Sequence, residues 1–375
     1  MARMMMRQVL VMFVAVMAHA TYAANTVDSV QAQAMLNLLE RCHLGGVPAQ
    51  AIDQVMDLPG TRLIVGQQNV SRRVTAAQYR EVLASTCRGE IAQVRPSEPG
   101  ARAEKGVQGL TDDVAPSLIW GRDHIELLKE KLVAAEQNKG FGEVVPLALE
   151  NLPEKIDLSP KLYVVMGGRA GAAASDEGIY FDLLADAWRS RASKASTTPH
   201  EMIEFFAHET HHVGYGRILD REREQLHLMG GEMQAWNFLT AVMMEGSATL
   251  LINGHGSWAE LQKQQHIQVD LARLPQLLPA AGNILQTALA GEMRDPEYQT
   301  RVSEFFGEGY HATGAKLLYV IEEARGRDAV LRVMEDPRSL LVVYNQCAAD
   351  RKEPFRFDPE LAGRIRTMGE SAPIE

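Results

Sequence analysis

The stretch from Thr198 to His212 constrains the fold of this chain most strongly, because it predicts a helix with a well-defined start. Thr198 can cap the amino end of that helix, and Pro199 suits the first position, where a backbone N–H has no partner in the helix. Glu201 stands three residues after Thr198 and completes a capping box. We therefore place the side chains of this stretch with helical periodicity.

His208 and His212 lie four residues apart on this helix, so both imidazoles project from one face and can converge on one ion. Glu209 is offset around the helix, where its carboxylate reaches a water beside the ion and can act as a general base. His211 offers a competing pairing with His208 at a spacing of three. We interpret His211 as a residue that supports the site or lies exposed.

A catalytic zinc takes three protein ligands and leaves a fourth position open for water or substrate. Glu245 is the candidate for the third ligand, because it is the one carboxylate in the apolar helical run 241–252. A carboxylate buried in such a run needs a partner. The small residues 246–248 should let this helix approach the first one closely. These positions predict one Zn²⁺ per chain, with His208, His212 and Glu245 as its ligands.

These motifs resemble those of the gluzincin metallopeptidases, in which a His-Glu-x-x-His helix is followed by a helix that carries Glu-x-x-Ala. The matching residues are His208, Glu209, His212, Glu245 and Ala248. The chain is also similar to poorly characterised bacterial zinc-dependent peptidases, which share a later Gly-Tyr segment, here Gly309 to Gly314. The resemblance spans roughly Leu162 to Asn345. It implies a zincin-like fold, and hydrolysis of peptide bonds with Glu209 as the general base.

The same resemblance implies two further roles. A tyrosine or histidine that faces the zinc stabilises the oxyanion in such enzymes, which suggests Tyr310 or His311 here. An edge strand binds the substrate backbone, which suggests either Lys161–Met166 or Gly178–Phe181.

Residues 1–23 are typical of a cleaved signal peptide. Arg3 and Arg7 precede the apolar run Val9–Met17, which is shorter than the roughly 20 residues of a membrane-spanning helix. Candidate cleavage sites follow at Ala18–Ala20 and Thr21–Ala23. No later apolar stretch looks long enough to span a membrane, so we expect a periplasmic or secreted protein.

The rest of the chain predicts an α+β fold in which helices dominate, with a small β unit before the metal-binding helix. Two short strands are expected at Lys161–Met166 and Gly178–Asp182. The expected divisions are an N-terminal helical region, a Pro- and Gly-containing linker or loop, and a catalytic domain, at residues 24–95, 96–116 and 117–375.

Export permits a disulfide bond, and the three cysteines leave its formation open. A pair between Cys42 and Cys87 would leave Cys347 as a free thiol.

The charge of the chain argues against nucleic acid as a partner. Its formal net charge is -10, and it has no cluster of Lys and Arg interleaved with aromatic residues. The expected partner is therefore a peptide or protein substrate, and the sequence does not specify an oligomeric state.

Two other functions compete with peptide hydrolysis. The first is a periplasmic binding or assembly protein on an inactive peptidase fold, although an intact Glu209 argues against it. The second is a di-iron protein, because residues 209–212 and 224–227 both have Glu-x-x-His spacing. Only 15 residues separate these motifs, and Gly214, Gly216 and Asp220 predict that the helix ends between them.

Overall fold

The computed structural model describes residues 27–46, 49–72, 75–90, 107–168, 171–175, 177–191, 197–291, 302, 305 and 308–370. The predicted signal peptide, residues 1–23, lies outside these described residues. So does the predicted linker up to residue 106, whereas residues 107–116 form the beginning of a helix.

The protein is predominantly helical with one small sheet, as the sequence predicts. The elements before the long central helix are β1 (Val27–Asp28), α1 (Val30–His43), α2 (Ala49–Met56), α3 (Pro59–Arg72), α4 (Ala76–Arg88), α5 (Val107–Asp123), α6 (Ile125–Glu136), η1 (Lys139–Glu143), α7 (Val144–Glu150), β2 (Leu162–Val165), β3 (Ala172–Ser175), β4 (Gly178–Asp182) and α8 (Leu183–Ser190). The remaining elements are α9 (Pro199–Gln225), α10 (Gly231–Ala248), η2 (Thr249–Asn253), α11 (Trp258–Leu261), α12 (Gln265–Ala272), α13 (Leu274–Leu289), α15 (Glu308–Arg325), α16 (Arg327–Glu335), η3 (Pro337–Ser339), α17 (Leu340–Asp350) and α18 (Pro359–Arg366).

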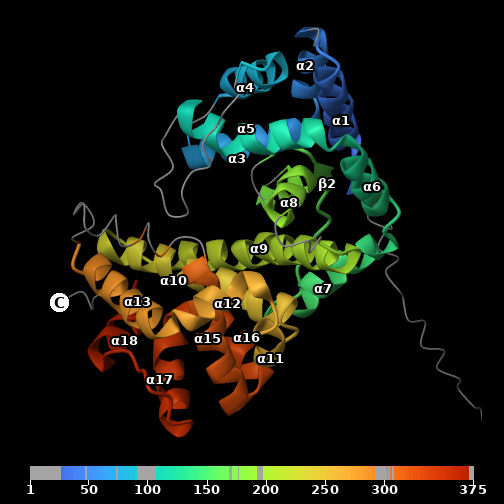
Figure 1. Cartoon of the computed structure of the whole chain (residues 1–375). Coiled ribbons are helices and arrows are strands. Elements are labelled where there is room, and N and C mark those ends of the chain that lie inside the picture. Colours follow the sequence, from blue (N-terminus) through green and yellow to red (C-terminus); the bar gives the residue numbers. More distant parts are fainter. Residues whose placement is uncertain are drawn as a thin grey trace, which may run out of the picture.

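Helix α9 runs across the middle of the molecule, with α1–α6 and α8 on one side and α13–α18 on the other (Figure 1). Its amino end has the predicted capping box, in which the Thr198 and Glu201 side chains each accept a hydrogen bond from the other residue's backbone N–H. The predicted end of this helix between the two Glu-x-x-His motifs is wrong, because α9 continues to Gln225. A Cβ at Gly214 would lie 2.5 Å from the Leu152 side chain, so this glycine serves close packing.

The N-terminal core is an apolar cluster from α1–α8, the sheet and the first turns of α9, including Phe206. Hydrogen bonds join the early helices to the end of β2: Gln31 exchanges two with the Met166 backbone, and the Tyr79 hydroxyl donates to the Gly167 carbonyl. Elements from both sides of the predicted linker thus share one core. The predicted domain boundaries stay a prediction.

The C-terminal core is a second cluster, formed by the last turns of α9 and by α10 to α18. Helix α10 and the π-helical turn η2 form a continuous stretch, Gly231–Asn253, that is long and apolar enough to cross a membrane. The expectation that no later stretch reaches this length is therefore wrong. Within the protein, 78% of an apolar 18-residue segment of that stretch is buried.

The sheet has the strand order β1-β2-β4-β3, with β2 parallel to both β1 and β4. Strand β3 pairs antiparallel with β4, so that Ala172 lies opposite Phe181. Both predicted strands exist, but β2 and β4 each pair on two sides, and neither is an edge strand. The prediction that one of them offers a free edge is therefore wrong. The edge strand that contacts α9 is β3.

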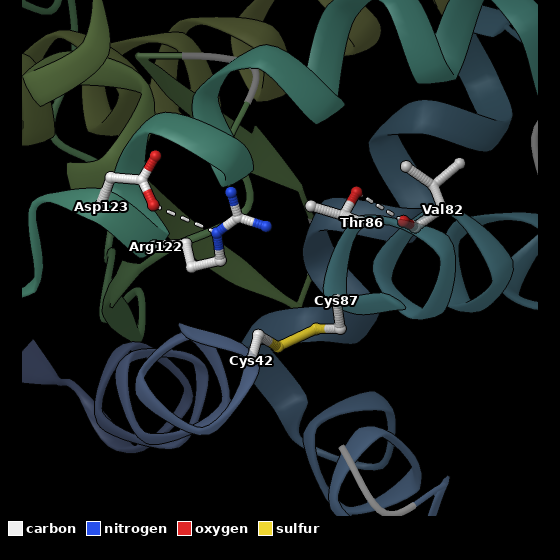
Figure 2. The surroundings of a disulfide bond; sticks show 6 residues. All are labelled: Cys42, Val82, Thr86, Cys87, Arg122 and Asp123. Carbon is white, nitrogen blue, oxygen red and sulfur yellow. Dashed lines mark hydrogen bonds and ion pairs between the residues drawn. A yellow bond between two sulfur atoms is a disulfide. The ribbon is translucent and has the colours of Figure 1, made fainter. Parts of the chain in front are cut away.

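A disulfide bond joins Cys42 to Cys87, with a Cα–Cα distance of 4.7 Å. Figure 2 shows how it links the last turns of α1 and α4. Cys347 is a free, buried cysteine. The structure thus resolves a pairing that the sequence left open.

Helices α10 and α15 cross at two glycines that leave no space for a side chain. A Cβ at Gly314 would lie 1.9 Å from the Val242 carbonyl oxygen, and one at Gly246 would lie 2.2 Å from the Gly314 backbone. Gly246, the small residue after Glu245, therefore lets α10 approach α15 closely. The sequence predicted that this residue lets its helix approach α9, and for Gly246 that prediction is wrong.

Changing Gly314 to Ala should lower the free energy of unfolding by about 1–3 kcal/mol, because the new methyl group must push the two helices apart. Chemical denaturation followed by circular dichroism measures this loss. Gly363→Ala is the matched control, since Gly363 is an exposed helical residue and a Cβ at this position would have no other atom within 4 Å. An equal stability of the two variants would contradict the close crossing.

Candidate metal centre

The structure brings together the three residues predicted as metal ligands. His208 and His212 come from α9 and Glu245 comes from the last turn of α10. Their candidate ligand atoms all lie within 4.8 Å of one another. The Nε2 atoms of His208 and His212 are 3.4 and 3.3 Å from Oε2 of Glu245. Two imidazoles and one carboxylate therefore face a common point.

Asn253 fixes the orientation of the His208 ring. Nδ1 of His208 lies 2.7 Å from the Asn253 side-chain oxygen and donates its proton there. In a neutral imidazole this leaves Nε2 with a lone pair, which is the form that binds a metal. That lone pair lies 3.4 Å from the Glu245 carboxylate, so one metal ion can bind both atoms. The donor set therefore fits a zinc ion.

His212 and Glu245 have strongly linked charges. Burial alone lowers the pKa of His212, but the carboxylates of Glu245 and Glu209 outweigh it and raise the pKa to about 10. Burial likewise raises the pKa of Glu245, but His212 and His208 hold it well below the usual carboxyl value. Nε2 of His212 is buried and has no well-aligned hydrogen-bond partner among the described residues. A cation bound between these side chains would neutralise the Glu245 carboxylate and give Nε2 of His212 a partner.

Glu209 lies beside the cluster, as its offset from His208 along the helix predicts. Its carboxylate is 3.7 Å from Nδ1 of His212, and its side chain is 17% exposed. It lines a cavity of about 550 Å³ together with His208, His212, Glu245 and residues 172–175 of β3. Glu209 can therefore contact both a bound substrate and a water next to the cluster.

His311 also lines this cavity, from the first turn of α15. Its Nδ1 lies 2.9 Å from the Thr249 hydroxyl and 3.3 Å from Oε2 of Glu245. Burial lowers the pKa of His311 to about 4, although Glu245 opposes this shift, so the ring is neutral at pH 7.

Tyr310, the other candidate for the oxyanion role, faces away from the cavity. It is buried in the C-terminal core, with ring centroids 5.5 Å from Phe238 and 5.2 Å from Phe305. It is not among the residues that line the cavity.

His211 lies on the other side of α9. It is fully buried next to Tyr215, and burial holds its pKa well below the ordinary value. It therefore packs in the interior of the protein and is not one of the candidate metal ligands.

The two Glu-x-x-His motifs lie along one helix and its end, and not on facing helices. Their separation of 15 residues corresponds to roughly 22 Å along a helix axis. Glu224 and His227 are exposed, and neither is among the described groups that could hold a metal. The structure therefore gives no support to a shared di-iron site.

Sequence reasoning missed Asn253, Thr249 and the strand β3. Asn253 is the first polar residue after the apolar stretch 250–252, and this could have drawn attention to it. Strand β3 reads Ala-Ala-Ala-Ser and has no β-branched or aromatic residue, so its composition indicates a loop.

A family model described as "Putative zinc dependent peptidase (DUF5700)" matches residues 121–353, more than half of the chain. The chain belongs to this family. The matched range contains α9, α10 and α15, and with them the whole cluster around Glu245. No curated protein and no solved structure matches the chain. Membership of the DUF5700 family supports zinc as the metal and peptide hydrolysis as the reaction class.

Asn253→Ala should weaken the binding of zinc by about 10- to 100-fold, because the His208 ring loses the acceptor that orients it. Competition with a chelating dye measures this affinity. The zinc ion in question is the one that no longer binds in His212→Ala. Asn253→Asp keeps an acceptor oxygen and should retain the affinity. Equal affinities in the wild type and Asn253→Ala would contradict the role of this contact.

Proposed function

We propose that this protein is an exported zinc-dependent peptidase with His208, His212 and Glu245 as the ligands of one zinc ion. The observation that carries the proposal is the convergence of these three side chains at one end of a cavity that Glu209 and His311 also line. A purely structural zinc site has no use for a carboxylate placed beside the ligands or for an open cavity.

When bound, zinc would polarise the scissile carbonyl and lower the pKa of a coordinated water toward about 7. Glu209 takes a proton from the attacking water, since its carboxylate adjoins the cluster without pointing at its centre. The same carboxyl group then delivers that proton to the leaving amine. Both transfers need a carboxylate that is accessible from the cavity, as Glu209 is.

His311 stabilises the developing negative charge on the carbonyl oxygen. If the Thr249 hydroxyl donates to Nδ1, the single proton of the neutral ring resides on Nε2. A fixed N–H donor of this kind, placed at the cavity, lowers the energy of the transition state more than that of the substrate. Tyr310 is assigned no such role because its ring packs in the core.

The substrate binds as an extended chain along β3. One side of β3 pairs with β4, and its residues Ala172 to Ser175 line the cavity opposite α9. A free strand edge can pair with the backbone of a peptide and leaves the side chains of that peptide to other contacts. The side chains of Ala172–Ala174 are single methyl groups, so they take up little space in the cavity.

Export is supported by the signal-like segment at residues 1–23 and by the Cys42–Cys87 disulfide, a bond that persists in oxidising compartments. The substrates would then be peptides or proteins outside the cytoplasm.

Glu209→Gln should lower peptidase activity by at least about 100-fold and leave the zinc in place, because the amide cannot accept the proton. His212→Ala and Glu245→Ala should lose the zinc ion of this centre together with the activity. Elemental mass spectrometry and the cleavage of denatured casein measure the two quantities. Full activity in Glu209→Gln, or no cleavage by the zinc-loaded wild type, would favour the binding or assembly protein instead.

His311→Gln should lower kcat by about 100-fold with little change in KM, since the lost donor acts mainly in the transition state. Tyr310→Phe keeps the packing of its ring and should retain most of the activity. Steady-state kinetics on a fluorogenic peptide compares the two variants. A large loss in Tyr310→Phe with normal kcat in His311→Gln would reverse the assignment.

A further inference from the structure

A second group of potential metal ligands lies on α9 nearer its amino end. His200 and Glu204 are four residues apart on the helix, and His255 follows the η2 turn. Oε1 of Glu204 is 3.3 Å from Nε2 of His200 and 2.9 Å from Nε2 of His255. The three ligand atoms lie within 4.8 Å of one another. None of these residues lines the cavity at the first centre.

Glu204 is a buried carboxylate that contacts two histidines. Its residue surface is only 8% exposed, and burial raises its pKa against the opposing effect of His255 and His200. A carboxylate removed from water in this way needs a positive partner to remain charged. A metal ion held by the same three side chains would supply that charge.

His255 is held toward Glu204 by an unusual backbone conformation. Its φ is +48°, and only one other non-glycine residue of the described chain, Lys352, has a positive φ. The turn around His255 is fixed by hydrogen bonds from the backbone N–H of His255 to Ile252 and of Gly256 to Leu250. Such a conformation costs of order 1 kcal/mol or more and persists where the surrounding contacts compensate for it.

We propose that His200, Glu204 and His255 bind a second zinc ion. Zinc at roughly 2.0–2.1 Å from nitrogen and oxygen ligands in a tetrahedron separates those ligands by about 3.3 Å. The two measured separations from Glu204, 2.9 and 3.3 Å, are close to this value. The side chains of His200 and His255 are 73% and 50% exposed, so a fourth position is open to water.

The second site is separate from the first. Glu204 and His208 are one turn apart, which is roughly 6 Å along the helix axis. Paired metals that act on one substrate lie about 3.5–4 Å apart, so these two ions would not form such a pair. The second ion ties α9 to the turn after η2, and that turn begins beside Asn253, the residue that orients His208.

Metal content distinguishes this site from the first without any measurement of activity. The chain is incubated with excess zinc, passed through a desalting column and analysed by elemental mass spectrometry. We expect two zinc ions in the wild type, one in His255→Asn, one in His212→Ala and none in the double variant. Asparagine is chosen at position 255 because it tolerates a positive φ. His227→Ala, which removes an exposed histidine elsewhere, is the matched control and should keep two.

Thermal unfolding gives a second readout. In the His212→Ala background, zinc at 100 times the dissociation constant of the second site should raise the Tm by roughly 3–4 °C, and the further change His255→Asn should remove this rise.

Equal zinc content in the wild type and His255→Asn, with the same Tm response in His212→Ala and in the double variant, would overturn the second site. Loss of one zinc in His255→Asn but none in His212→Ala would support the second site and contradict the ligands proposed for the first.

Discussion

The crossing of α10 and α15 at Gly246 and Gly314 is the contact on which the geometry of the metal centre depends. Glu245 directly precedes Gly246, and His311 lies three residues before Gly314, so both side chains are placed by this one crossing. The absence of Cβ atoms lets the two backbones touch. This brings Nδ1 of His311 to 3.3 Å from Glu245. A side chain at either glycine would separate a ligand from the residue proposed to act beside it.

Helix α9 supplies the other half of the centre and belongs to both cores. Phe206 packs in the N-terminal core and Tyr215 packs in the C-terminal core. His208 and His212 lie between these two anchors, where the helix passes from one apolar cluster to the other. A cavity can form there because neither core covers this part of α9 completely. The site is thus both open to substrate and held by rigid elements on two sides.

Local sequence signals were sufficient to predict the helical start of α9, the two histidines, Glu209 and Glu245, because spacing and capping residues act over a few positions. The signals failed where the outcome depends on distant partners. Gly214 looked like a helix end, but its role depends on Leu152, which lies 62 residues earlier. Tyr310 and His311 are adjacent, and only the packing of α15 decides which of them faces the cavity. Strand β3 exists through its pairing with β4, which its alanines do not indicate.

The four residues His200, Glu204, His208 and His212 follow one another at intervals of four and form a single polar row along α9. The buried members of this row, Glu204 and His208, are costly to remove from water unless cations neutralise the carboxylate and satisfy the ring nitrogens. The segment 253–255, at the end of η2 and in the turn after it, contacts this row twice, through Asn253 at His208 and through His255 at Glu204. A shift of this segment would therefore change the geometry of both sites. The left-handed His255 and the His208–Asn253 hydrogen bond are best understood as parts of one support for the metal-binding face of α9.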